Sequence, residues 1–222
     1  MSSKRALIFD MDGVLIDSSP SHREAWDRFN LRYGLRTDEA MHQRIYGKRN
    51  DDILRDFFGP ELSREEVFAR GAEKEALWRE MVAPRLSQCL VPGVRTFLER
   101  HRHRPMGLGT NAEPANVDFL LDGAGLRRYF RVVVDGHQVS RPKPDPEIYR
   151  RVAELLGMDP RDCVIFEDSY SGVQAARAAG AKVVAVRTTH REFKEVDLTV
   201  DHFLSPELEP WLAGLELEPV AV

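Results

Sequence analysis

Short runs of consecutive apolar residues recur along the chain and are separated by polar segments. They lie at Ala6–Phe9, Met106–Gly109, Val132–Val134, 163–166 and Lys182–Val186. A short apolar run without alternation is typical of a strand that is buried on both faces of a parallel sheet. We therefore expect each of these runs to form a strand of one parallel sheet.

Helical patterns lie between the later runs, over residues 114–121, 146–156 and 172–179. Gly157 and Gly180 follow two of these patterns, and a glycine at that position is typical of a helix end. Strands that alternate with helices predict an α/β fold with a doubly wound sheet. The expected core is therefore a Rossmann-like, doubly wound parallel sheet.

One long interval, residues 17–88, has helical patterns and no strand-like run. Apolar residues recur at helical spacing at Ala25, Trp26, Phe29 and Tyr33. Residues 63–66, Ser-Arg-Glu-Glu, have the pattern of a capping box that opens a further helix. We expect an all-helical cap domain at residues 17–88, inserted into an α/β catalytic core made of residues 1–16 and 89–222.

Composition and net charge restrict the classes of function that this protein can have. The chain has 222 residues, of which 42% are hydrophobic and 31% charged, as in ordinary globular proteins. Its 32 basic and 36 acidic residues give a net charge of −4, which argues against nucleic-acid or anionic-membrane partners. The two cysteines, Cys89 and Cys163, are too few for a disulfide framework, and no apolar run approaches the ~18 residues of a membrane span. We expect a cytoplasmic monomer that acts on a small molecule.

Polar side chains follow three of the expected strands. These residues are Asp10 and Asp12 after the first strand, Thr110 and Asn111 after the second, and Glu167 and Asp168 after the run 163–166. The carboxyl ends of the strands in an open parallel sheet border one crevice. We therefore expect these side chains to meet there, although they are far apart in sequence.

The carboxylates of this group predict a metal site. Several acids in one pocket cannot all remain ionised unless a cation lies among them. Oxygen ligands without histidine or cysteine favour Mg2+. The alternative is that one acid pair caps a helix while the other is solvated; acids beside buried strands are costly unless they are paired, which favours the metal site.

Lys143 lies in the segment Arg141-Pro142-Lys143-Pro144-Asp145-Pro146. The flanking prolines stiffen the backbone, so the lysine is presented from a fixed loop. An ammonium group held near carboxylates and a metal suits a phosphoryl group. The alternative is an exposed lysine in a loop that leads into a helix at Pro146.

Four segments together resemble the motifs of the haloacid dehalogenase superfamily, in the same order. They are residues 9–15 (Phe-Asp-Met-Asp-Gly-Val-Leu), Thr110-Asn111, residues 143–146 (Lys-Pro-Asp-Pro) and residues 166–169 (Phe-Glu-Asp-Ser). The helical insertion, with residues 20–26, is similar to the cap of the β-phosphoglucomutase-like branch. The resemblance covers nearly the whole chain.

The resemblance implies a role for each site residue. Asp10 would be the nucleophile that forms an aspartyl phosphate, and Asp12 would protonate the leaving alkoxide and then activate water. An acid at the second position makes carbon–halogen cleavage an unexpected activity, because dehalogenating members do not need one there. The remaining implied roles are phosphoryl binding by Thr110, the Asn111 backbone amide and Lys143, and Mg2+ binding by the Asp10 carboxylate, the Asp12 carbonyl and Asp168, with Glu167 helping directly or through water.

The resemblance implies a Mg2+-dependent phosphatase of small phosphorylated metabolites, with sugar phosphates favoured, or alternatively a phosphomutase that converts β-glucose 1-phosphate to glucose 6-phosphate. The expected substrate contacts in the cap are His22, Lys48, Arg49 and Asn50. His22 could equally be a satisfied histidine near the hinge. Asn50 stands where the mutase pattern predicts an arginine, which favours the phosphatase. A Schiff-base lysine, as in related phosphonate-cleaving enzymes, could only be Lys48 and is not expected.

Two other classes compete with phosphoryl transfer. Residues 107–112, Gly-Leu-Gly-Thr-Asn-Ala, match the dinucleotide-binding fingerprint, and Asp135 follows at about the distance of a ribose-binding acid. That fingerprint requires a strand before its first glycine, whereas these glycines lie inside an expected strand. A non-catalytic binding module would be expected to have lost Asp10 or Asp12, and both are present.

Overall fold

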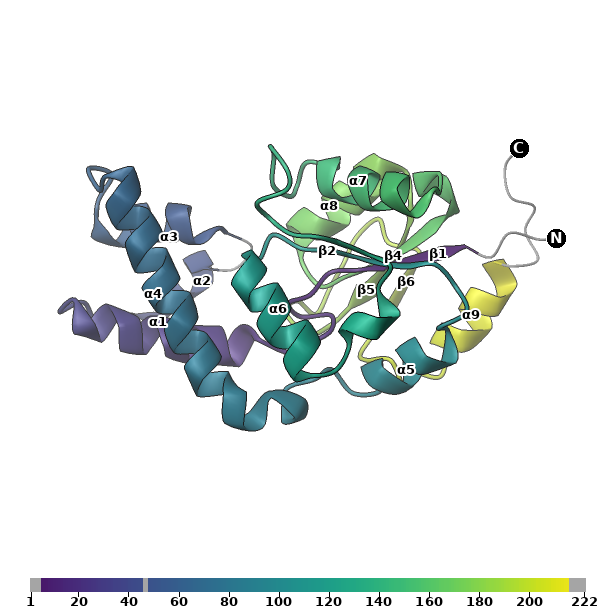
Figure 1. Cartoon of the computed structure of the whole chain (residues 1–222), viewed down its shortest axis with the longest axis horizontal. Helices are drawn as coiled ribbons and strands as arrows, with labels where there is room; N and C mark the ends of the chain where they lie inside the picture. The colour runs from purple at the N-terminus through teal and green to yellow at the C-terminus, as the bar shows by residue number, and fades with distance from the viewer. Residues whose placement is uncertain (1–4, 46–47, 216–222) are drawn as a thin grey trace. The chain divides into compact units, whose positions relative to one another are not determined.

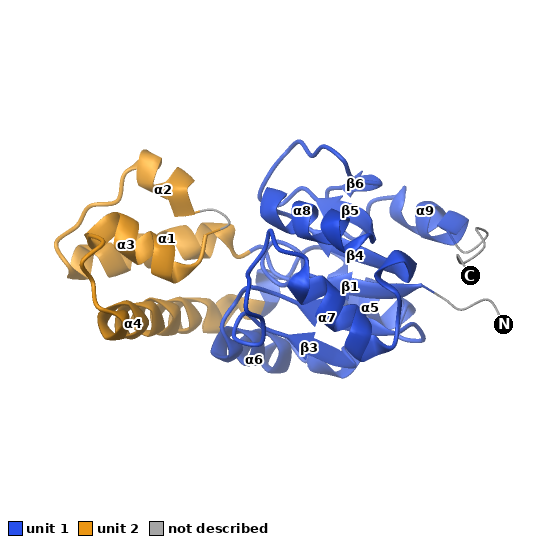
Figure 2. Cartoon of the chain, turned by 90° about the horizontal axis from the view of Figure 1, so that it is seen from above, with its two compact units in different colours: residues 1–17, 87–222 blue, residues 18–86 orange. Residues whose placement is uncertain are grey.

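The computed structural model describes residues 5–45 and 48–215. The chain divides into two compact units, which Figure 2 shows in separate colours. We call residues 1–17 with 87–222 the core unit and residues 18–86 the cap unit. None of the described helices is both long and apolar enough to cross a membrane.

The core unit contains a parallel sheet in the order β3-β2-β1-β4-β5-β6 (Figure 1). Its strands are β1 (Ala6–Phe9), β2 (Met106–Gly109), β3 (Val132–Val134), β4 (Cys163–Glu167), β5 (Lys182–Val186) and β6 (Leu198–Val200). The helices of the unit are α5 (Val94–Arg100), α6 (Pro114–Gly123), α7 (Glu147–Leu156), α8 (Tyr170–Ala179) and α9 (Leu208–Leu215). Short 3₁₀ turns are η2 (Arg127–Tyr129) and η3 (Pro160–Asp162). The predicted α/β fold is confirmed, and the short edge strand β6 is an addition that the apolar runs did not indicate.

Both faces of the sheet are covered, as the continuous apolar strands require. Ala6 and Ile8 of β1 point to one face and belong to the cluster formed with α7 and α8. Phe9 points to the other face, where it stacks on Phe166 at 4.8 Å between ring centroids and meets Phe97 of α5 edge-on at 6.2 Å. Figure 1 shows α7 and α8 on one side of the sheet and α5 and α9 on the other. This burial on both faces explains why the strands lack a polar alternation.

The cap unit consists of helices in its described residues. They are α1 (Ser19–Arg32), α2 (Glu39–Ile45), α3 (Asn50–Phe58) and α4 (Arg64–Val82), and the 3₁₀ turn η1 (Ala83–Gln88) follows α4. The expected capping box is present, because the Ser63 hydroxyl accepts from the Glu66 amide while the Glu66 carboxylate accepts from the Ser63 amide. The unit has its own apolar core of Trp26, Phe29, Ile53, Leu54, Leu62, Val67 and Leu77.

The strand order determines where a ligand site can form. From the central strand β1 the chain adds β2 and β3 on one side, and then crosses to add β4, β5 and β6 on the other. β1 and β4 are therefore the neighbours at which the direction of winding changes. In open parallel sheets, the carboxyl ends of the strands at such a switch point border the binding crevice.

Candidate active site

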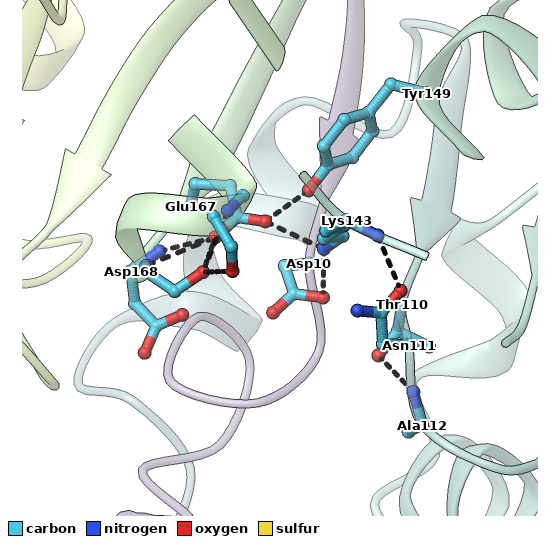
Figure 3. A network of polar contacts seen from close by, with 11 residues as sticks. Asp10, Thr110, Asn111, Ala112, Lys143, Tyr149, Glu167 and Asp168 are labelled. Carbon is cyan, nitrogen blue, oxygen red and sulfur yellow. Dashed lines mark hydrogen bonds and ion pairs between the residues drawn. The ribbon is translucent and has the colours of Figure 1, made fainter. Parts of the chain in front are cut away.

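Acidic and polar residues occupy the carboxyl ends of β1, β2 and β4, as expected from the sequence. Asp10 follows β1, Thr110 follows β2, and Glu167 is the last residue of β4. The Asp10 amide donates to the Phe166 carbonyl at 3.0 Å, which extends the pairing of β1 with β4 by one residue. Figure 3 shows these side chains facing one another, together with Lys143 from the loop before α7.

Lys143 links the acids that end the two central strands. Its Nζ lies 2.7 Å from Asp10 Oδ1 and 2.7 Å from Glu167 Oε1. Its backbone amide donates to Asn111 Oδ1 at 3.3 Å, so the loop that carries Lys143 is tied to the segment after β2. The lysine side chain is buried, which excludes the alternative of an exposed lysine in a solvated loop.

The Glu167 carboxylate is surrounded by hydrogen-bond donors. Oε1 accepts from Lys143 Nζ and from the Tyr149 hydroxyl at 2.5 Å. Oε2 accepts from the Asp168 amide at 3.0 Å and from the amide and hydroxyl of Ser169 at 3.2 and 3.1 Å. A Cβ atom at Gly172 would lie 1.8 Å from Oε1, so only glycine lets the first turn of α8 close over this carboxylate. These donors hold Glu167 in one orientation.

Asp168 is held from two other segments. The Thr189 hydroxyl, in the loop after β5, donates to Asp168 Oδ2. The neighbouring Thr188 hydroxyl donates to the Gly13 carbonyl at 2.6 Å. Gly13 has a φ of +73°, and a Cβ there would lie 1.9 Å from Asp168 Oδ2. The loop after β1 therefore turns directly against the carboxylate of Asp168, the residue that follows β4.

The protonation of the site reflects burial and an excess of acids. Burial raises the pKa of Asp10 to about 7, with Lys143 opposing the shift and the charges of Glu167 and Asp12 adding to it. Burial, with the charges of Glu167 and Asp10, raises the pKa of Asp168 well above its usual range. Burial opposes the charged form of Glu167 as well, but the charge of Lys143 and the hydrogen bonds from Lys143, Tyr149 and Ser169 together outweigh burial and lower the pKa of that carboxyl.

Lys143 is the cation that balances these acids in the described part of the site. Burial alone would lower its pKa, but Asp10 and Glu167 outweigh burial and raise it. The lysine is therefore protonated at neutral pH. One ammonium group among three carboxyls leaves negative charge that a further cation would balance.

The donor set fits a divalent metal ion. One carboxylate oxygen from each of Asp10, Glu167 and Asp168 lies within 4.8 Å of the other two, and all three residues are buried. These are hard oxygen donors, which match the preference of Mg2+. The pKa values of Asp10 and Asp168 are raised, which indicates that the positive charge around these two carboxyls is insufficient.

The other residues predicted for the core unit lie around this centre. Asp12 lies in the tight loop after β1, where its backbone forms an isolated β-bridge with Ile16. Its charge contributes to the raised pKa of Asp10. Thr110 is buried, and its hydroxyl accepts from the Ala112 amide at 3.2 Å. Asn111 contacts the backbone of Lys143. The structure therefore brings these residues together at one edge of the sheet, and their catalytic roles stay predictions.

The residues predicted for the cap unit have partners within that unit. Lys74 Nζ lies 2.9 Å from His22 Nδ1 and 2.7 Å from Glu75 Oε1, and Asn50 Nδ2 donates to the same Glu75 oxygen at 2.7 Å. The His22 ring also stacks on Trp78, at 4.5 Å between centroids. Lys48 Nζ lies 3.6 Å from Asp56, and Arg49 is the N-cap of α3. Substrate contact by His22, Lys48, Arg49 and Asn50 stays a prediction.

Sequence reasoning missed two residues of the site, Tyr149 and Thr189. Tyr149 lies on the apolar face of α7, and the sequence pattern there predicts only a core residue. The one feature that could have indicated a polar role is its hydroxyl, which needs a hydrogen-bond partner when it is buried. Thr189 lies in a polar loop after β5, among residues that have no distinctive spacing. Both reach the site only through the packing of the folded chain.

The sheet and its acidic, lysine-bearing switch point define an α/β protein with a polar site at the carboxyl ends of its strands. A family model for haloacid dehalogenase-like hydrolases matches residues 4–180. The chain belongs to the haloacid dehalogenase-like hydrolase family, as its four motifs predict.

Two relatives agree with this family, and a solved structure shares the fold. Over 181 residues the chain is 36% identical to the fructose-1-phosphate phosphatase YqaB of Escherichia coli, covering 82% of this chain and 95% of that protein. It is 38% identical over 181 residues to a phosphorylated carbohydrates phosphatase of Thermotoga maritima, covering 79% and 81%. A crystal structure of β-phosphoglucomutase from Clostridium difficile shares the fold, with a TM-score of 0.81, 24% identity and coverage of 96% and 98%.

Proposed function

We propose that this protein is a Mg2+-dependent phosphatase that hydrolyses small phosphorylated sugars through an aspartyl phosphate on Asp10. The observation that carries the proposal is the buried contact of Lys143 Nζ with both Asp10 and Glu167, beside Asp168. A carboxylate nucleophile, an ammonium group and a cluster of metal-binding oxygens are the parts that phosphoryl transfer to a carboxylate needs.

The reaction has two displacements at phosphorus. In the first, an Asp10 oxygen forms a bond to phosphorus while the bond from phosphorus to the sugar oxygen breaks, and Asp12 gives its proton to that oxygen. In the second, the water oxygen forms a bond to phosphorus while the bond from phosphorus to Asp10 breaks, and Asp12 takes a proton from the water. Inorganic phosphate leaves, and both aspartates return to their starting states. Asp12 thus acts as the acid and then as the base.

The phosphoryl oxygens need positive charge and hydrogen-bond donors. Lys143 supplies a fixed ammonium group, and its buried position limits screening by water. The Thr110 hydroxyl and the Asn111 amide, on the segment tied to Lys143, supply donors in this proposal. The site would therefore hold the phosphoryl group with little reorganisation during transfer.

The metal ion would be held by the Asp10 and Asp168 carboxylates and the Asp12 carbonyl. When bound, Mg2+ would polarise the phosphoryl group and reduce its repulsion from the attacking carboxylate. Glu167 would contribute directly or through water, while the hydrogen bonds to both of its oxygens fix its orientation. Thr189 would hold Asp168 in place.

The names of the relatives support sugar phosphates as the substrate class, because phosphatases of fructose 1-phosphate and of phosphorylated carbohydrates share 36% and 38% of aligned residues. One residue of the cap unit, Asn50, favours hydrolysis rather than the phosphomutase activity. Asn50 offers a neutral amide where the mutase pattern predicts a guanidinium, and that amide donates to Glu75. A neutral amide gives a weaker hold on a second phosphate group than an arginine.

Phosphorus NMR distinguishes the two activities. The enzyme with Mg2+ is incubated with fructose 1-phosphate, and separately with β-glucose 1-phosphate and a trace of the 1,6-bisphosphate. We expect inorganic phosphate to accumulate from at least one of these sugars. Growth of glucose 6-phosphate without inorganic phosphate would show the mutase instead, and no reaction with either sugar or with a wider panel of phosphate esters would contradict both.

A further inference from the structure

Tyr149 of α7 contacts two members of the site yet takes no part in the proposed steps. Its side chain is fully buried. Its hydroxyl donates to Glu167 Oε1 at 2.5 Å, the same oxygen that accepts from Lys143 Nζ at 2.7 Å. Figure 3 shows the tyrosine reaching Glu167 from the side opposite the Asp168 backbone. The glutamate is therefore held between the two residues that precede α8 and a phenol on α7.

The ring of Tyr149 contacts Lys143 as well. Lys143 Nζ lies 4.7 Å from the ring centroid, within the range of a cation–π contact. The attraction between an ammonium group and a ring face is stronger where water is excluded, and both side chains are buried. One residue thus contacts Lys143 with its ring and Glu167 with its hydroxyl.

β2 is shaped to admit this tyrosine. A Cβ atom at Gly109 would lie 3.3 Å from Cδ1 and Cε1 of the Tyr149 ring, and one at Gly107 would lie 2.4 Å from Cγ1 of Val152. The two glycines let α7 approach the sheet closely enough for the phenol to reach Glu167. The Gly-Leu-Gly segment that resembles a dinucleotide fingerprint is therefore explained by helix packing.

The hydrogen bond from Tyr149 to Glu167 is charge-assisted. A phenol donates it and a carboxylate accepts it, and such a bond is stronger than one between two neutral groups.

We propose that Tyr149 is a positioning residue for Lys143, holding the ammonium group in place for the phosphoryl oxygens through its ring and through Glu167. The inference rests on the proposed function, because it takes Lys143 to be a ligand of the phosphoryl group. Tyr149 itself does not touch the substrate in this account. Its removal should weaken phosphate binding without removing any group that reacts.

The test compares Tyr149→Phe with the wild-type enzyme. Phenylalanine keeps the ring under Lys143 and removes one of the two donors to Glu167 Oε1. A hydrogen bond to a charged group is worth enough to change an equilibrium by tenfold or more. In the presence of Mg2+ we expect the dissociation constant for inorganic phosphate, measured by titration calorimetry, to rise about tenfold, with a matching rise in KM. Tyr149→Leu, which also removes the ring, should weaken phosphate binding further.

Tyr129→Phe is the matched control. Tyr129 is a buried tyrosine of the same unit, and its hydroxyl donates to the Glu99 carboxylate at 2.8 Å, away from the site. Both Phe variants should lower the melting temperature modestly, and only Tyr149→Phe should change phosphate affinity. A merely structural role would lower the fraction of folded enzyme, and hence kcat, while the dissociation constant for phosphate stayed the same.

The outcomes separate this inference from the proposed function. If wild type hydrolyses sugar phosphates and Tyr149→Phe binds phosphate equally well, the positioning role is wrong and the phosphatase proposal stands. If wild type has no phosphatase activity but binds phosphate, a loss of affinity in Tyr149→Phe still supports the positioning role. If wild type neither hydrolyses sugar phosphates nor binds phosphate, both proposals fail.

Discussion

Asp10 shows how the residues of this site depend on one another. Burial raises its pKa to about 7, whereas contact with Lys143 at 2.7 Å acts in the opposite direction. The protonation of Asp10, the proposed nucleophile, therefore depends on Lys143 and Glu167 from two other segments and on Asp12 from its own loop. Asp12 lies in the same loop but is only partly buried, which suits a group that exchanges protons with a leaving group and water.

Asp12→Ala should separate acid catalysis from phosphoryl transfer. A sugar alkoxide is a poor leaving group and needs a proton, whereas an activated aryl phosphate does not. We expect hydrolysis of a sugar phosphate to fall by about 10²–10⁴-fold and hydrolysis of p-nitrophenyl phosphate to fall much less. Steady-state rates with the two substrates provide the comparison. An equal loss with both would show that Asp12 has a structural role.

Thr189→Val should weaken metal binding. Valine keeps the shape of threonine but removes the hydroxyl that donates to Asp168 Oδ2. Losing a hydrogen bond to a ligating carboxylate typically costs about 10–100-fold in metal affinity. We expect Mg2+ titrations of the purified protein to show a loss in this range, while Thr189→Ser keeps affinity close to wild type. Equal Mg2+ affinity in all three proteins would exclude the positioning role of this hydroxyl.

At the scale of elements, helix α4 of the cap unit contains a buried ion pair between Lys74 and Glu75. Lys74 and Glu75 are 2% and 5% exposed, and their opposite charges lie against each other. His22 Nδ1 lies within hydrogen-bond distance of Lys74, and Asn50 donates to Glu75. Burial would raise the pKa of Glu75, but the charges of Lys74 and His22 and the hydrogen bonds from Lys74 and Asn50 together outweigh burial and lower that pKa to about 2. Neutralising one member of a buried pair leaves the other without compensation.

Glu75→Gln should therefore destabilise the protein at neutral pH by about 3–5 kcal/mol. Because the pKa of Glu75 is lowered on folding, its contribution is fully present above the usual value of 4.5 and is lost as the pH falls toward about 2. The stability difference between wild type and variant should narrow as the pH falls from about 5 toward 2. Denaturant unfolding at several pH values measures this difference.

Glu80→Gln supplies the control for that experiment. Glu80 is an exposed residue on the same helix, and surface substitutions usually change stability by about 0.5 kcal/mol or less. A pH-independent difference between wild type and Glu75→Gln would show that the ion pair does not have the assigned role.

Elements with a strong local signal could be predicted from the sequence. The apolar runs Ala6–Phe9 and Lys182–Val186 are β1 and β5, and the capping box at Ser63 opens α4. β6 was missed, because Leu198–Val200 is only three residues long and has no continuous apolar pattern. Short edge strands depend on pairing with a neighbour more than on their own composition.

At the scale of the whole molecule, strand order decides which residues meet. Asp10 and Glu167 are far apart in sequence but end adjacent parallel strands, so the rule for strand ends was enough to place them together. Tyr149 and Thr189 could not be found this way. Tyr149 reaches Glu167 through the packing of α7 against glycines of β2, and Thr189 reaches Asp168 through the loop after β5. Such contacts depend on the separation of helix and sheet, which no local pattern specifies.

The residues of the cap unit show a second limit. His22 and Asn50 were expected to contact the substrate, and in the structure they make polar contacts with Lys74 and Glu75 of α4. A sequence motif identifies residue types, but it does not show which residues of α4 will be the partners of His22 and Asn50 after folding. The monomeric state, the cytoplasmic location and the substrate contacts of the cap stay predictions.

The central claim is that Asp10 carries the phosphoryl group. The most direct test incubates wild type and Asp10→Asn with Mg2+ and a sugar monophosphate that the wild type hydrolyses, stops the reaction with acid during turnover, and maps phosphorylated peptides by mass spectrometry. The account predicts a phosphoryl group on Asp10 in wild type, and neither the adduct nor measurable turnover in a folded Asp10→Asn variant. Substantial turnover by Asp10→Asn, or a phosphoryl group on another residue, would contradict it.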